Sequence, residues 1–165
     1  MFRDMRRKRQ VLVKEECDKI LKRGTSGVLA LHGDDGFPYA VPISYLYDGS
    51  KLYFHCAKAG HKIDAIIRSP KASFCVIDQD RVVPEKYTTY FRSVIVFGTI
   101  RIINDEREIA ESIEKLALKY APDDSAESRK DEIARYRSSL CMLEMMPEHI
   151  SGKQAKELMN PNIIS

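Results

Sequence analysis

Gly60, His61 and Lys62 are the residues whose types and spacing best suit chemistry, because they stand where a helix is expected to begin. Backbone amides in the first turn of a helix lack intrahelical partners, and the helix dipole adds partial positive charge there. A cation at that end costs about 0.3–1 kcal/mol at an exposed site, and an anion would offset this cost. The segment therefore predicts a phosphate site. Two solvated first-turn side chains are the alternative interpretation.

Pro42 interrupts a strand that the pattern predicts for residues 39–47. Proline cannot donate to a sheet ladder, so it belongs at a sheet edge or a bulge. One interpretation is that the sheet splits here and frees the backbone groups of Val41, Ile43 and Ser44 to face the polar edge of a ring system. The other is a plain edge strand without a ligand.

His55 lies in the next predicted strand, residues 52–57, just before the proposed phosphate turn. It shares a strand face with Tyr53 and Ala57, because the side chains of a strand alternate between faces. A histidine in a strand is usually a structural residue, but this position suits a side chain that faces a ligand. His55 is therefore the candidate catalytic residue, as an assistant in proton delivery, and a tyrosine near it is the alternative.

Periodicity and turn signals predict six strands in hairpin order with inserted helices. The predicted strands are residues 27–32, 39–47, 52–57, 72–77, 93–103 and 140–146. The predicted helices are residues 14–23, 61–68, 105 to about 120, and 127–136. Residues 79–92 are expected to form a long loop, and the tail from Pro147 is expected to be irregular.

The first three predicted strands form a meander, because the turns between them are too short for parallel crossovers. Together the strands predict a mainly β fold, an antiparallel barrel with peripheral helices. Closing the sheet into a barrel would remove its exposed edges.

The 165 residues are most simply one domain, residues 1–165, with a basic N-terminal arm over about residues 1–12. A net charge of +3 is too small to indicate a nucleic-acid partner, and the arm is expected to be solvated. No stretch reaches the roughly 20 apolar residues of a membrane span. The four cysteines are scattered, which favours free thiols in a reducing cytoplasm. The four histidines show no spacing typical of a metal site.

Six motifs follow one another along the chain: Met5-Arg6-Arg7-Lys8-Arg9-Gln10, Pro38-Tyr39-Ala40-Val41-Pro42-Ile43, Asp48-Gly49, Leu52-Tyr53-Phe54-His55-Cys56-Ala57, Gly60-His61-Lys62-Ile63-Asp64 and Val96-Phe97-Gly98-Thr99. In order and spacing they resemble the nitroimidazole-resistance (Nim-like) branch of the pyridoxamine 5′-phosphate oxidase-related flavoproteins. The resemblance covers about residues 5–157, and its central block is the part specific to this branch.

The resemblance implies a six-stranded antiparallel split β-barrel of the FMN-binding type, an obligate homodimer, and FMN in a groove between the subunits. It implies that His61 and Lys62 contact the phosphate. The residues implied to lie beside the flavin rings and ribityl chain are Val41, Pro42, Ile43 and Ser44, and those of the adjoining wall are His55, Cys56, Ala57 and Lys58. In such proteins the flavin carries the redox chemistry and the protein positions it.

The chain is shorter than pyridoxamine phosphate oxidase and shows none of that enzyme's basic substrate-phosphate residues toward its C-terminus, so vitamin B6 oxidation is not expected. The leading hypothesis is an FMN-dependent reductase of a small electron-poor molecule such as a nitroaromatic, with NAD(P)H or another reductant as electron donor. One alternative is a non-enzymatic flavin- or haem-binding module, and a deazaflavin is a further alternative cofactor. A structural dimer or nucleic-acid binder that uses the basic arm is the third hypothesis.

Overall fold

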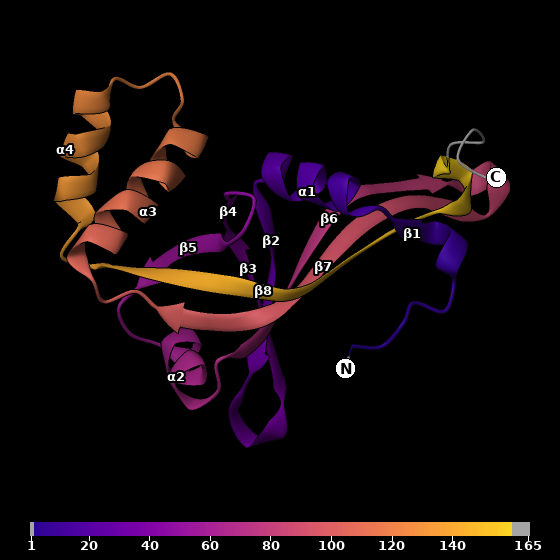
Figure 1. Ribbon diagram of the computed structural model, residues 1–165, viewed down its shortest axis with the longest axis horizontal. Coiled ribbons are helices and arrows are strands. Elements are labelled where there is room, and N and C mark those ends of the chain that lie inside the picture. Colours follow the sequence, from indigo (N-terminus) through magenta and orange to yellow (C-terminus); the bar gives the residue numbers. More distant parts are fainter. Residues whose placement is uncertain (1, 160–165) are drawn as a thin grey trace.

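The computed structural model describes residues 2–159, and eight strands in that range form one antiparallel sheet (Figure 1). The strands are β1 (Val11–Leu12), β2 (Ser26–His32), β3 (Pro38–Ser44), β4 (Leu46–Tyr47), β5 (Leu52–Ala57), β6 (Lys71–Val83), β7 (Thr88–Ile102) and β8 (Leu140–Gln154). Their order across the sheet is β3-β2-β6-β7-β8-β5-β4, and β1 also pairs with β8. The long strand β8 pairs with β7, with β5 through its first half, and with β1 near its end.

In the same range, four α-helices flank the sheet: α1 (Lys14–Arg23), α2 (His61–Arg68), α3 (Glu106–Tyr120) and α4 (Ala126–Tyr136). The predicted bounds of α1 and α2 are confirmed, because Gly24 and Pro70 gave clear stop signals. The side chain of Asp105 accepts a hydrogen bond from the amide of Glu108 at 2.9 Å, which confirms the predicted cap of α3. None of the helices in residues 2–159 is long and apolar enough to cross a membrane.

Two apolar clusters hold the elements together. The larger one fills the concave side of the sheet and includes the fully buried Tyr45, Phe54 and Phe74, against which α1 and α2 pack. The smaller one lies under α3 and includes Tyr53, Ile103, Ile109, Ile113 and Met142. In Figure 1, α3 and α4 form a helical hairpin at one end of the sheet, beside β5 and the start of β8. The sheet thus has one face filled by the core and one face that α3 covers at that end.

The expectation of a closed six-stranded barrel is wrong: the sheet has eight strands in the described range, and it is open between β3 and β4. Only Tyr45 separates these two edge strands along the chain. Side chains of α3 bind its backbone in place of a ladder. The Tyr45 amide donates to the Tyr120 hydroxyl at 3.0 Å, and the Tyr45 carbonyl accepts from Lys119 Nζ at 3.0 Å. The chain therefore changes from one sheet edge to the other without leaving these backbone groups unpaired.

Both hairpins of the predicted meander are confirmed, because β2 pairs with β3 and β4 pairs with β5, but the middle strand predicted for residues 39–47 is broken at Tyr45 into β3 and β4. Residues 79–92 are not a long loop. They are the end of β6, a tight turn at Pro84–Lys86 and the start of β7, paired up to Val83 and Thr88. The tail from Pro147 is not irregular, since β8 continues to Gln154 along β7 after a register shift near Gly98. Polar side chains on a two-stranded extension away from the core hid the strand alternation in the sequence.

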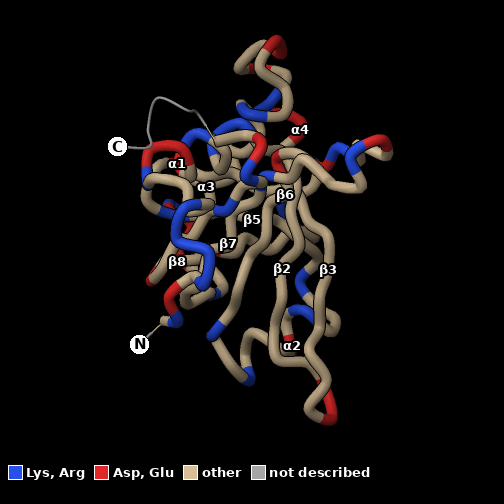
Figure 2. Tube along the Cα trace, turned by 90° about the vertical axis from the view of Figure 1, so that its right-hand side faces the viewer, with Lys and Arg blue, Asp and Glu red and all other residues tan. Residues whose placement is uncertain are grey.

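The basic arm carries Arg3, Arg6, Arg7, Lys8 and Arg9 as exposed side chains. Figure 2 shows this run of positive charge along the N-terminal segment. The same view shows β2 and β3 free of charged residues along their length. The two regions therefore offer opposite kinds of surface, one strongly basic and one uncharged.

Candidate functional site

The start of α2 has the backbone of an anion site. Gly60 precedes the helix with φ 120° and ψ 173°, and no side chain caps the helix. Its carbonyl accepts the amides of Ile63 at 2.8 Å and Asp64 at 3.2 Å. Within residues 2–159, the amides of His61 and Lys62 donate to no protein acceptor. Two free amides and the positive end of the helix dipole therefore meet at this point.

Lys62 adds a charge that the protein does not neutralise. Its side chain is half-buried and forms no ion pair with any residue in the described part of the chain. Burial lowers the pKa of His55, and the nearby positive charge of Lys62 lowers it further. His55 is therefore a neutral imidazole at pH 7, and it lies close enough to Lys62 for the positive charge of Lys62 to act on it. A half-buried cation without a counterion, beside free amides, fits a bound anion.

His61 is turned toward the β2–β3 turn. Its ring stacks on Tyr39 with centroids 4.0 Å apart, and its Nε2 lies 3.4 Å from a carboxylate oxygen of Asp34. Arg68 binds the same turn through the Gly33 carbonyl at 2.8 Å and through Asp34 at 2.5 Å. These contacts fix the helix start against the turn, whereas Lys62 has no ion-pair partner in residues 2–159. The expected contact of His61 with a phosphate stays a prediction.

The predicted wall on β5 presents two different faces. His55 and Ala57 are exposed on the convex face of the sheet, whereas Cys56 points toward the core and is half-buried. Cys56 stands opposite Cys141 of β8, and burial raises the pKa of its thiol to about 11. Both thiols are therefore protonated at neutral pH and serve as packing groups. Lys58 follows as an exposed residue of the turn that leads into α2.

The predicted wall on β3 lies at the edge of the sheet. Pro42 pairs with Val28 of β2, and none of the described strands lies on its other side, so the sheet-edge interpretation is confirmed. Val41 and Ile43 pack against the core, while Pro42 is exposed and Ser44 half-buried on the opposite face. The strand approaches β5, although no ladder joins the two. The structure therefore brings the β3 and β5 walls to the same open edge.

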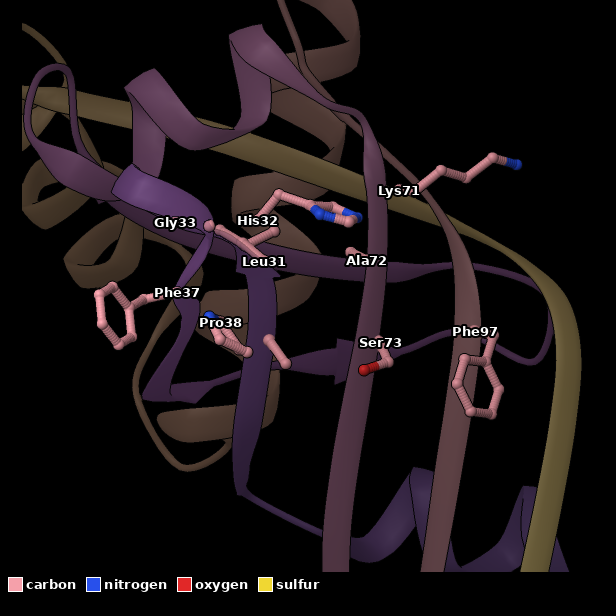
Figure 3. Close-up of a pocket in the computed structure, with 11 residues that line it drawn as sticks. Leu31, His32, Gly33, Phe37, Pro38, Lys71, Ala72, Ser73 and Phe97 are labelled. Atoms are coloured by element: carbon pink, nitrogen blue, oxygen red, sulfur yellow. The ribbon is translucent and has the colours of Figure 1, made fainter.

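A hollow of about 330 Å³ lies on the convex face, beyond the predicted walls. Figure 3 shows His32 and Lys71 at one end of it, with Ser73 and Phe97 on the neighbouring strands β6 and β7. Sequence reasoning missed this hollow, as well as the contacts of Tyr39 and Asp34 with His61. All of them join residues far apart in the chain, so local periodicity carries no signal for them.

No group of three His, Cys, Asp or Glu side chains in residues 2–159 is placed to hold a metal ion. In the described residues, the chemical resources of the site are therefore free amides, the unpaired ammonium groups of Lys58 and Lys62, a neutral imidazole and an uncharged sheet edge. Such a set can bind an anion and position a flat molecule, and it includes no nucleophile with an adjacent base.

Comparison with solved structures finds the same fold. One such structure is a protein from Bacteroides thetaiotaomicron whose description proposes that it is a 5-nitroimidazole antibiotic resistance protein. It superposes with a TM-score of 0.73 at 19% identity over 87% of this chain and 86% of that one. The FAD and heme binding protein from Mycobacterium smegmatis superposes with a TM-score of 0.72 at 21% identity over 90% of this chain and 74% of that one. At these identities the likeness shows the fold alone, a split-barrel type of sheet.

Sequence comparison identifies the family. An uncharacterized protein from Rhizobium meliloti (strain 1021) is 36% identical over 69 residues, which are 42% of this chain. The match spans less than half of that relative, 44% of its length. Residues 13–154 match the family described as pyridoxamine 5′-phosphate oxidase, and this range includes every predicted site residue. The chain therefore belongs to the pyridoxamine 5′-phosphate oxidase family.

Proposed function

We propose that the protein is a flavin-dependent reductase of a small, flat, electron-poor molecule, with FMN as its flavin, in the nitroimidazole-resistance branch of its family. One observation carries this proposal: the half-buried Lys62 has no counterion in the described residues and stands beside two free amides at the start of α2. A flavin mononucleotide combines a phosphate with a flat ring system. The phosphate suits this helix start, and the rings suit the uncharged edge of β3.

The residues present fit such a cofactor. The amides of His61 and Lys62, with the Lys62 ammonium, would hold the phosphate. The free edge of β3 around Pro42 would lie along the rings, and His55 would face them from β5. A bound flavin would supply electron transfer between NAD(P)H or another reductant and the substrate. The imidazole of His55 is neutral at pH 7 because its pKa is lowered, so it can accept a proton at that position and then pass it on.

A homodimer completes the proposed site. Val28, Cys75, Ile95 and Ser151 form one row across the convex face of the sheet, and the row continues to Pro42 on β3. Val28 and Ile95 are each 37% exposed, and no helix of the described chain covers them. A second copy on this row would bury apolar side chains and reach the β3 edge. The flavin would then lie between two subunits of a cytoplasmic enzyme.

The proposal is tested by replacing Lys62 with methionine, which keeps the length of the stem and removes the charge. Charge-assisted hydrogen bonds contribute about 1.5–3 kcal/mol, so FMN should bind about 10–150-fold more weakly. Riboflavin, which has no phosphate, should bind as it does to the wild type. The exposed Lys130 of α4 provides the control Lys130→Met, which should leave both affinities unchanged. Equal losses for FMN and riboflavin in Lys62→Met would reject the phosphate role.

A non-enzymatic flavin, deazaflavin or haem module is the second candidate function. It is supported by the exposed position of His55, a neutral imidazole that could ligate an iron, and by a structural neighbour described as binding FAD and heme. Visible spectra of the purified protein separate the two functions. An intense Soret band would indicate haem, whereas a flavin spectrum that NAD(P)H bleaches would indicate a reductase. A flavin spectrum without turnover of any acceptor would favour the binding module.

A further inference from the structure

A groove of about 270 Å³ lies between α3 and α4, and His55 of β5 is one of its lining residues. Its main lining residues are Ile113, Leu116 and Ala117 of α3, Ile133 of α4, Leu140 of β8 and His55 of β5. The lining is mainly apolar, and the His55 imidazole is a polar group on its sheet side. The groove therefore joins the convex face that carries the proposed flavin site.

The two helices hold the groove open. In the described chain, α4 has no fully buried side chain, and its Ile133 is a partly buried residue that packs against the smaller apolar cluster. Ion pairs also connect this helix to α3: Arg129 lies 3.4 Å from Glu114, and Arg137, directly after α4, lies 2.5 Å from Glu106. Apolar walls that are held apart in this way leave room for a ligand. The volume lies just below the range of about 300–1,000 Å³ that is typical for drug-sized ligands, which indicates a smaller molecule of one or two rings.

The charges around the groove discriminate against an anion. Arg129 is the one Lys or Arg among the described lining residues, and Glu114 already neutralises it. Asp124 and Glu132 line the groove as acidic groups. A carboxylate that entered would lose its hydration without gaining a free cationic partner among the lining residues, since Lys62, whose charge acts on His55, does not line the groove. A neutral polar group can instead hydrogen-bond His55, since a neutral imidazole offers one donor and one acceptor.

We propose that this groove binds a small, uncharged aromatic molecule of one or two rings, with its polar substituent at His55. This proposal rests on the proposed function in one respect: in a flavin-dependent reductase, the groove defines the substrate class as neutral aromatic molecules rather than aromatic acids. His55 of β5 would then contact the polar substituent of the molecule in the groove and also face the proposed flavin. The binding itself needs no flavin.

The test uses two probes of nearly the same shape, 2-naphthamide and 2-naphthoate, which differ in charge. Calorimetric titration of the full-length protein is carried out without flavin and with FMN. We expect 2-naphthamide to bind in both cases and 2-naphthoate to bind at least tenfold more weakly. Equal affinity for the amide and the carboxylate would overturn the proposal.

A matched pair of variants locates the binding. Ala117→Phe fills the groove and should weaken 2-naphthamide binding at least tenfold. Ala110→Phe makes the same change at an exposed position of α3 outside the groove and should leave binding within twofold of the wild type. Unchanged binding in a folded Ala117→Phe protein would overturn the proposal. If that variant does not fold, the wild type decides: saturating 2-naphthamide should shift the imidazole NMR signals of His55, and unshifted signals would overturn the proposal.

The groove proposal and the FMN proposal can be refuted independently of each other. Binding of 2-naphthamide without flavin, together with equal losses of FMN and riboflavin in Lys62→Met, would support the groove and reject the FMN role. FMN binding that depends on Lys62, together with absent 2-naphthamide binding, would overturn the groove and leave the flavin site in place.

Discussion

Gly60→Ala tests whether the backbone at the start of α2 holds a phosphate. Gly60 has φ 120° and ψ 173°, a region that residues with a Cβ avoid, and an added Cβ would meet no atom within 4 Å. The cost of the substitution is therefore backbone strain alone, about 1–3 kcal/mol. In a domain of this size 1 kcal/mol corresponds to about 2–4 °C in Tm, so Tm should fall by about 2–12 °C.

Relief of that strain would rotate the peptide groups that present the amides of His61 and Lys62. Loss of charge-assisted hydrogen bonds to a phosphate, about 1.5–3 kcal/mol, should weaken FMN about 10–150-fold and spare riboflavin. Flavin fluorescence titration measures both affinities, and circular dichroism of the flavin-free protein measures Tm.

Gly36→Ala is the matched control, because Gly36 also has a positive φ, 80°, and an added Cβ there would meet no atom within 4 Å. It should lower Tm without changing FMN affinity. A Gly60→Ala protein that loses stability but binds FMN within twofold of the wild type would refute the assignment of these amides.

Two further predictions concern stability at low pH and assembly. Burial raises the pKa of Glu144, but hydrogen bonds from Lys51 and Arg101, both 2.9 Å long, outweigh burial and lower that pKa below its usual value. The stabilisation is therefore present above the unfolded pKa of about 4.5 and is lost as pH falls through the folded pKa. Glu144→Gln should lower the free energy of unfolding by about 1–3 kcal/mol at pH 7. It should also make the loss of unfolding free energy between neutral and acidic pH less steep than in the wild type. A loss as steep as that of the wild type would contradict this assignment. Ile95→Lys should convert the proposed dimer to a monomer in sedimentation, whereas Leu118→Lys on the exposed face of α3 should not; a monomeric wild type, or a dimeric Ile95→Lys protein, would count against the interface.

Local signals in the sequence were enough to locate the helices and the strand centres. Gly24 and Pro70 end α1 and α2 where the structure ends them, and Asp105 caps α3 as its spacing with Glu108 indicated. Helix caps and stop signals depend only on residues a few positions apart, so they can be recognised in the sequence itself. Pro42 likewise indicated a sheet edge, because a missing amide constrains the strand wherever it lies in the fold.

Pairing between distant strands could not be predicted in the same way. Tyr45 separates two edges of one open sheet because Lys119 and Tyr120, some 75 residues later, bind its backbone groups. The turn at Pro84–Lys86 looked like part of a loop because its flanking strands leave the core and lose their alternation. The orientation of His61 follows from Tyr39 and Asp34, and no pattern near residue 61 contains that information.

The groups that the fold leaves without partners lie near one another. A free strand edge invites unwanted pairing, and a proline on the edge limits that hazard, as Pro42 does on β3. A half-buried ammonium without a counterion is unfavourable in a folded protein, yet Lys62 lies beside two unpaired amides. Each feature alone has a structural explanation. Their convergence at the open edge between β3 and β5 is explained most simply by a ligand with an anionic end and a flat, uncharged body, because such a molecule would satisfy all three.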